Sequence, residues 1–206
     1  MALGRRGGEG HPRVRGEMQK IAQLEQFALR YGLLFRRDIP RGELSDTYVY
    51  SHDMQYRYAF ARWWGVDGPL VLWVGVNPAK GDTEQRRRPT LERCIRWSRS
   101  WGAAGVLIGN LFAARHNEPK DLRKTPDPIG PHNDEALKVM TEMANRTVVA
   151  WGNEGQRHGR PEQVARLLSQ PVCFGFTVAG QPRHPLYVPN DTPVEPWQSE
   201  RRQTTR

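Results

Sequence analysis

Apolar residues in this chain are gathered into short segments that alternate between two spacings. Residues 69–76 read PLVLWVGV, a continuous apolar run that is typical of a strand buried on both faces. Residues 90–101 follow a proline and space their apolar side chains three and four positions apart, which predicts a helix. The alternation continues, with strands predicted over 104–113, 147–151 and 171–177 and helices over 133–144 and 161–168. This order favours a three-layer α/β fold, a mostly parallel sheet flanked by helices.

The two ends of the chain differ from this central pattern. Residues 18–31 carry apolar side chains at helical spacing, and the aromatic-rich residues 48–64 are predicted to be extended. Residues 1–16 and 198–206 offer little to bury, so we expect two disordered tails, the first of them basic. Residues 17–197 are expected to form a single α/β domain, because 206 residues are short for two.

Composition excludes several classes of protein. No apolar run approaches the roughly 18 residues that a membrane-spanning helix needs, and residues 1–10 lack the apolar stretch of a signal peptide. Two cysteines, Cys94 and Cys173, cannot build a disulfide framework or an all-cysteine metal site. No two of the six histidines lie three to five positions apart. We therefore expect a cytoplasmic monomer with no metal, no cofactor and no membrane partner.

Positive charge suggests an anionic partner. The formal net charge is +9, and residues 84–99 contribute six arginines against two glutamates. Such a basic stripe is the pattern expected for contacts with a nucleic-acid backbone, although a solvated helix face would look the same. The stripe residues that we expect to contact phosphates are Arg86, Arg87, Arg88, Arg93 and Arg96.

Each predicted strand ends in polar residues, and these are the candidates for chemistry. Functional groups of open parallel sheets gather beyond the carboxyl ends of the strands, so we expect Asn77, Asn110, Gly152 and His184 to converge on one rim. The candidate catalytic residues are Asn77 and His184, and the candidate binding residues are Asn110, Arg115, Gly152, Asn153 and Arg183. The alternatives are structural: Asn77 followed by proline is also a common turn starter, and His184 is also compatible with an ordinary surface loop.

Two familiar catalytic motifs do not fit the chain. The segment from Gly75 to Gly81 places its lysine before the second glycine, which inverts the order of a phosphate-binding loop. The chain also has no Gly-x-Ser-x-Gly elbow for a nucleophilic serine.

A family resemblance spans residues 52–190. The segments that carry it are Gly75–Ala79, Asp82–Trp101, Gly109–Arg115, Pro128–Asn133, Val149–Gly152 and Gly180–Tyr187. In this order they resemble the domain-of-unknown-function 1643 family. A second resemblance, carried by Gly75–Pro78, by Asn110–Pro119 and by His184–Pro185, is to the uracil-DNA glycosylase superfamily, which implies a fold of that type.

The second resemblance also implies a reaction. In that superfamily the asparagine after the first strand holds the attacking water and the histidine of the final motif stabilises the departing base, roles that would fall on Asn77 and His184. The implied activity is an N-glycosylase acting on a modified or damaged base, with DNA as the first expected partner. Asparagine is not a strong general base, so such an enzyme needs a good leaving group. The alternative is a module that binds a nucleotide or nucleic acid without catalysis.

Overall fold

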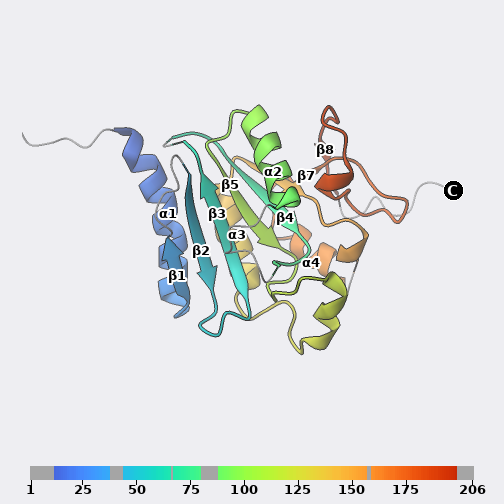
Figure 1. Cartoon of the computed structure of the whole chain (residues 1–206), viewed down its shortest axis with the longest axis horizontal. Helices are drawn as coiled ribbons and strands as arrows, with labels where there is room; N and C mark the ends of the chain where they lie inside the picture. Colours follow the sequence, from blue (N-terminus) through green and yellow to red (C-terminus); the bar gives the residue numbers. More distant parts are fainter. Residues whose placement is uncertain (1–11, 38–43, 66, 80–87, 157–158, 199–206) are drawn as a thin grey trace, which may run out of the picture.

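The described chain is built around one mixed sheet. The computed structural model describes residues 12–37, 44–65, 67–79, 88–156 and 159–198. Within them, eight strands lie in the order β1-β2-β3-β5-β4-β6-β7-β8 (Figure 1). The strands are β1 (Leu34–Arg37), β2 (Ser45–Tyr50), β3 (Arg57–Trp63), β4 (Leu70–Gly75), β5 (Gly105–Asn110), β6 (Arg146–Val149), β7 (Val172–Cys173) and β8 (Glu195–Pro196). The disorder predicted for residues 1–11 and 199–206 falls outside the described residues.

Parallel pairing is confined to the centre of the sheet. Strands β5, β4, β6 and β7 are parallel neighbours. Strands β1, β2, β3 and β5 pair antiparallel in that order, and β8 pairs antiparallel with β7. The expectation of a mostly parallel sheet is therefore corrected to a mixed sheet with a parallel centre.

A tight turn explains the additional antiparallel strands. Residues 48–64, predicted as one extended stretch, belong to β2 and β3 and to the turn between them. In this turn the Asp53 carboxylate accepts hydrogen bonds from the Ser51 hydroxyl at 2.6 Å and from the Gln55 backbone N–H at 3.0 Å. The reversal brings the aromatic residues of both strands together, with the Tyr48 and Phe60 ring centroids 5.0 Å apart.

The predicted helices are present, with changed ends. The α-helices are α1 (Pro12–Arg30), α2 (Pro89–Ser100), α3 (Asn133–Met143) and α4 (Arg160–Ala165), and the 3-10 helices are η1 (Pro119–Lys124), η2 (Asn153–Gly155) and η3 (Pro185–Tyr187). Helix α1 begins within the segment that we expected to be a disordered tail. None of the helices in the described parts of the chain is long and apolar enough to span a membrane.

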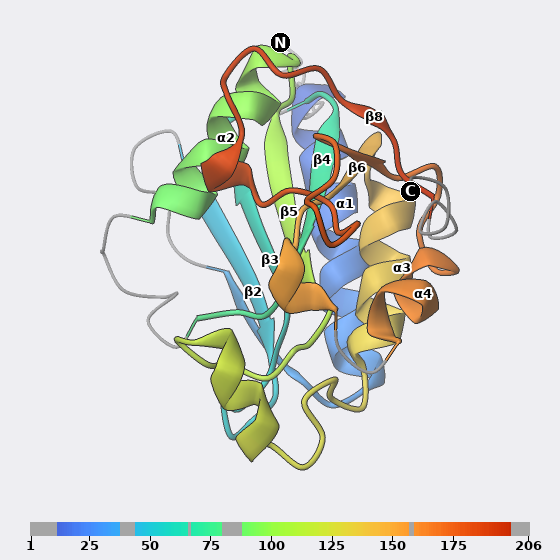
Figure 2. The same cartoon turned by 90° about the vertical axis from the view of Figure 1, so that its right-hand side faces the viewer.

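Helices cover the two faces of the sheet unequally (Figure 2). Helices α1 and α3 pack together on one face, where Leu137 and Met140 of α3 join the same buried cluster as Leu72 and Val74 of β4. Helix α2 packs on β4 and β5 from the other face, against a second cluster that contains Trp73. The alternation of Leu72, Trp73 and Val74 between the faces explains why the β4 sequence is continuously apolar.

Candidate functional site

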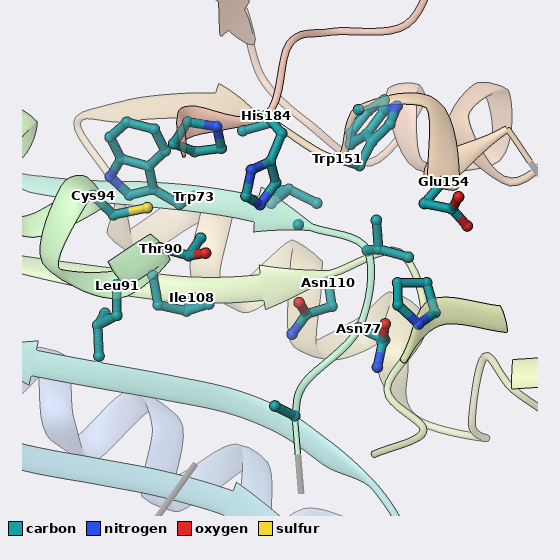
Figure 3. A pocket seen from close by; sticks show the side chains of 18 of the residues that line it. Trp73, Asn77, Thr90, Leu91, Cys94, Ile108, Asn110, Trp151, Glu154 and His184 are labelled. Atoms are coloured by element: carbon teal, nitrogen blue, oxygen red, sulfur yellow. The ribbon is translucent and has the colours of Figure 1, made fainter. Parts of the chain in front are cut away.

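A cavity of about 930 Å³ opens beside α2, beyond the carboxyl ends of β4, β5 and β6 (Figure 3). Strand β4 pairs with β5 on one side and with β6 on the other. The following helices, α2 and α3, lie on opposite faces, so β4 is the point at which the winding of the sheet reverses. Ligand crevices of α/β sheets form at such points. The four residues predicted to converge on one rim meet here, since Asn77, Asn110, Gly152 and His184 all line the cavity. The candidate binding residues Asn153 and Arg183 line it as well.

Asn77 follows β4 and has a fixed orientation. Its Nδ2 donates to the backbone oxygens of Pro78 at 3.1 Å and His116 at 2.7 Å. Two carbonyl acceptors require the amide nitrogen at this position, which leaves Oδ1 as an acceptor. Oδ1 makes no hydrogen bond to the described part of the chain, and Asn77 lines the cavity. The structure thus presents a positioned acceptor to whatever occupies the cavity.

Asn110, at the end of β5, is a buried amide that faces the cavity. Only 4% of the residue is exposed, and its side chain makes no hydrogen bond within the described residues. A Cβ placed on neighbouring Gly75 would lie 3.3 Å from Asn110 Oδ1, so the glycine leaves room for this amide. Buried amides in folded proteins nearly always have a hydrogen-bond partner. Asn110 therefore marks a place for a polar group of a ligand or for water.

His184 forms part of another wall of the same cavity (Figure 3). Its Nδ1 accepts a hydrogen bond of 3.4 Å from the backbone N–H of Leu186, so the proton of the neutral ring lies on Nε2. Burial lowers the pKa of His184 from its ordinary value of 6.5, which keeps the ring neutral at pH 7. His184 is therefore a neutral donor through Nε2.

Gly152 holds this wall in place rather than offering a functional group. Its φ of 63° suits glycine, and its N–H donates to Pro182 O at 2.8 Å. A Cβ at this position would lie 3.3 Å from the Cβ of His184. The absence of a side chain at Gly152 thus allows the histidine to approach β6.

The other predicted binding residues separate into two groups. Asn153 accepts a hydrogen bond of 2.5 Å from the Thr177 hydroxyl, and Arg183 donates through Nε to Phe176 O at 3.1 Å, so both lie at the cavity wall with structural contacts. Arg115 does not line the cavity. Its Nη1 donates to Met54 O at 2.8 Å, and its guanidinium lies 5.1 Å from the centroid of the Tyr50 ring.

The arginines of the basic stripe have different environments. Arg88 lines the cavity, whereas Arg93 donates to the backbone oxygen of Val188 and connects α2 to the segment after η3. Arg96 is exposed, and the Arg99 guanidinium lies 4.8 Å from the Trp64 ring centroid. Arg86 and Arg87 lie outside the described residues.

The sequence analysis missed Arg57, which lines the cavity from β3. The residue is only 5% exposed, and burial lowers the pKa of its guanidinium to about 10, so it remains charged at neutral pH. The available signal was a charged residue inside the aromatic segment of residues 56–64. Its position at the cavity depends on β3 pairing antiparallel with β5, which the sequence pattern did not predict.

Two further residues that the sequence analysis missed support the end of β5. The Asn133 side chain donates to the backbone oxygens of Asn110 at 3.0 Å and Leu111 at 3.1 Å. Arg160, 1% exposed, donates through Nε to Leu111 O at 2.8 Å and pairs with Asp134. These contacts fix the backbone that carries Asn110.

The acidic and thiol groups of the cavity do not suit catalysis by a buried nucleophile. Burial strongly raises the pKa of the Cys94 thiol, so the thiol stays protonated and unreactive. Among the described lining residues, Glu154 carries the only carboxylate; it is exposed, and in Figure 3 it points away from His184. The groups best placed for chemistry are therefore amides, an imidazole and guanidinium groups.

Comparison with known proteins gives one family. The model of the family described as "Protein of unknown function (DUF1643)" matches residues 57–186, which covers β3 to η3 and most of the cavity. Neither the curated proteins nor the solved structures contain a match to the chain.

Proposed function

This chain belongs to the DUF1643 family, and from its cavity we propose that it binds a nucleotide unit and hydrolyses the bond between the base and the sugar. The observation that carries the proposal is the pairing of Asn77 Oδ1, a positioned acceptor, with His184 Nε2–H, a neutral donor, in one cavity. The resemblance of Gly75–Pro78 and His184–Pro185 to glycosylase motifs supports the same assignment.

The proposed reaction divides between these two residues. Asn77 Oδ1 accepts a hydrogen bond from a water and directs its oxygen toward the anomeric carbon of the sugar. The carbon–nitrogen bond breaks with its electron pair passing to the base, the water oxygen bonds to the carbon, and the water proton is released. His184 Nε2–H donates to the oxygen of the departing base, where negative charge develops. A neutral imidazole suits this role, because it donates a hydrogen bond and stays neutral throughout the reaction.

The lining of the cavity supports a partly apolar ligand with polar edges. Phe60, Ile108 and Ala150 contribute apolar side chains to its lining, and the buried Asn110 amide offers both a donor and an acceptor. A nucleobase has apolar faces and polar edges, so an extruded base matches this combination. Asn77 is too weak a base to deprotonate water fully, which points to a modified, damaged or deaminated pyrimidine with a good leaving-group base.

A screen for released bases tests the proposal. Purified full-length protein is incubated with a panel of modified DNAs and nucleotides, and free bases are detected by mass spectrometry. We expect Asn77→Ala to lower the turnover while sparing binding. We expect His184→Ala to lower it by on the order of 100- to 1000-fold, as loss of an oxyanion donor does. The control His52→Ala removes an exposed histidine from the turn after β2 and should leave turnover unchanged. Release at the wild-type rate by both cavity variants would contradict the proposed roles.

A binding module without catalysis is the second candidate. The exposed position of Glu154 favours it, because this carboxylate, the only one among the described lining residues, points away from His184 and is not arranged as a base for the attacking water (Figure 3). This candidate predicts that nucleotides raise the melting temperature of the protein while no base is released from any member of the panel.

A further inference from the structure

One end of the cavity gathers positive charge between the sheet and the first turn of α2. Arg57 from β3 and Arg88 at the start of α2 both line this space. The Arg57 guanidinium lies 5.6 Å from the centroid of the Phe60 ring, which holds it over the sheet face. Two guanidinium groups at one end of a cavity form a geometry that suits a multivalent anion.

The N-terminus of α2 adds to this positive end. Arg88 is the N-cap residue and its side chain forms no capping hydrogen bond, while Pro89, Thr90 and Leu91 line the cavity. The backbone N–H groups of a first helical turn have no acceptor within the helix and carry partial positive charge. Helix α2 spans twelve residues, which is long enough for its dipole to favour an anion at this position.

The two guanidinium groups lie near each other. Burial and the nearby Arg57 charge lower the pKa of Arg88. Both groups remain protonated at neutral pH, so this end of the cavity carries positive charge. A phosphate bound there would accept charge-assisted hydrogen bonds from both groups.

The rest of the cavity lining indicates the chemistry of the other part of the ligand. Asn110 is 4% exposed, and its side chain makes no hydrogen bond within the described residues. It lines the same cavity as the apolar Ile108 and Phe60. A ligand that fills the cavity therefore joins an anionic group to a flat group with polar edges, which is the chemistry of a nucleotide.

We propose that Arg57, Arg88 and the first turn of α2 form a subsite for the terminal phosphate monoester of a nucleotide. This inference rests on the proposed occupation of the cavity by a nucleotide. Arg57 is 5% exposed, so a phosphate that contacts it must lie inside the cavity with its nucleoside. A terminal phosphate monoester is largely a dianion and matches two guanidinium groups, whereas an internal phosphodiester carries a single negative charge. The substrate is therefore a free mononucleotide or the phosphorylated end of a strand.

Isothermal titration calorimetry of the full-length protein tests the subsite without any base release. The probes are thymidine, thymidine 5′-monophosphate, and a thymidine decamer with and without a 5′-phosphate. We expect the monophosphate to bind roughly 10- to 100-fold more tightly than the nucleoside, the range for charge-assisted hydrogen bonds. Inorganic phosphate should compete with the monophosphate. Equal affinity for the nucleoside and its monophosphate would overturn the proposal.

Matched variants assign the effect to the subsite. Arg88→Gln and Arg57→Gln should remove most of the affinity gap, whereas Arg30→Gln, an equal loss of charge at the exposed end of α1 on the opposite face of the sheet, should preserve it. If Arg57→Gln does not fold, the half-buried Arg88 still decides the question. An unchanged gap in Arg88→Gln would overturn the subsite.

The decamers separate the two sources of the phosphate. A gain from the 5′-phosphate that matches the mononucleotide gain supports a strand end as a source, and tight binding of the mononucleotide alone supports a free nucleotide. Equal, tight binding of both decamers would indicate internal phosphates and overturn the terminal assignment. A phosphate-dependent gap without base release from any substrate would keep the subsite and reject hydrolysis. Base release without a gap would do the reverse.

Discussion

The two faces of the central sheet differ in how completely the helices cover them. The face under α1 and α3 is closed by apolar side chains such as Leu137 and Met140, both completely buried. Among the described residues, α2 closes the other face only in part, and the remaining part carries Arg57 and Asn110. The first face provides stability through burial, and the second accepts buried polar groups that a ligand can satisfy. Substitutions should therefore separate stability from binding according to the face that they change.

The largest effect is expected on the closed face. Leu137→Ala removes a fully buried side chain of α3 and should lower the free energy of unfolding by about 2–5 kcal/mol. Urea denaturation followed by tryptophan fluorescence measures the change. At temperatures where the variant is folded, thymidine monophosphate should bind as it does to the wild type. A loss below about 0.5 kcal/mol would show that this face does not support the fold as described.

Two buried asparagines, Asn110 at the end of β5 and Asn133 of α3, test the comparison further. Asn133→Ala removes hydrogen bonds to the backbone oxygens of Asn110 and Leu111 and should cost about 1–3 kcal/mol of unfolding free energy. Asn110→Ala removes an amide without a hydrogen bond to the described chain, so its unfolding free energy should change by less than about 1 kcal/mol. Ligand affinity should fall in the second variant. Equal losses of stability in the two variants would argue against an open role for the Asn110 side chain.

Gly152 joins the two regions, because it follows the core strand β6 by three residues and lies beside His184. Gly152→Ala places a Cβ at a φ of 63° and 3.3 Å from the His184 Cβ. We expect a loss of about 1–2 kcal/mol in unfolding free energy together with a lower rate of base release. Gly102→Ala is a control for backbone strain alone, because Gly102 has a φ of 73° and no atom within 4 Å of its added Cβ. Equal rates of base release by the two variants would show that the contact with His184 does not affect the reaction.

The smallest effect is the pH dependence that His184 contributes. Its pKa in the folded protein is lowered below 6.5, so between the two values the unfolded chain binds a proton that the folded chain does not. The stability from His184 is therefore present above about pH 6.5 and lost as pH falls through the lowered pKa. His184→Asn keeps a side-chain acceptor for the Leu186 N–H but cannot titrate.

Melting temperatures of the wild type and His184→Asn across a pH series measure this term. Their difference should be constant above about pH 7 and should shift against the wild type as the solution becomes more acidic. A shift in favour of the wild type at acidic pH would mean that the folded state raises the pKa of His184.

The sequence predicted which strand ends meet better than it predicted how the strands of the sheet pair. Asn77 and Asn110 converge because parallel neighbouring strands end at the same edge, and the apolar runs over 69–76 and 104–113 were enough to identify those strands. Arg115 lies away from the cavity lining because the turn around Met54 offers it a carbonyl acceptor, and that turn belongs to a hairpin that the pattern predicted as one extended stretch. Arg57 was missed for the same reason.

Long-range pairing limited the prediction in physical terms. A hydrophobic run indicates that a strand is buried, but not which strand lies beside it. The antiparallel pairing of β3 with β5 joins residues far apart in sequence, and it decides which face Arg57 shares. The local spacing of apolar residues does not indicate such a pairing. The positions of the strand ends in a βαβ unit, by contrast, follow from the right-handed crossover rule.

The order of segments in the cavity has a consequence for the refolding of the chain. Its walls come from the ends of β4, β5 and β6 and from η3, so the groups from Asn77 to His184 meet only after two parallel pairings, of β4 with β5 and with β6, and the return of η3 to α2. Contacts of such sequence separation form slowly. Recovery of helical structure should therefore precede assembly of the cavity, and a chain released before η3 is synthesised would carry the lining residues of β3, β4 and β5 without the wall that contains His184.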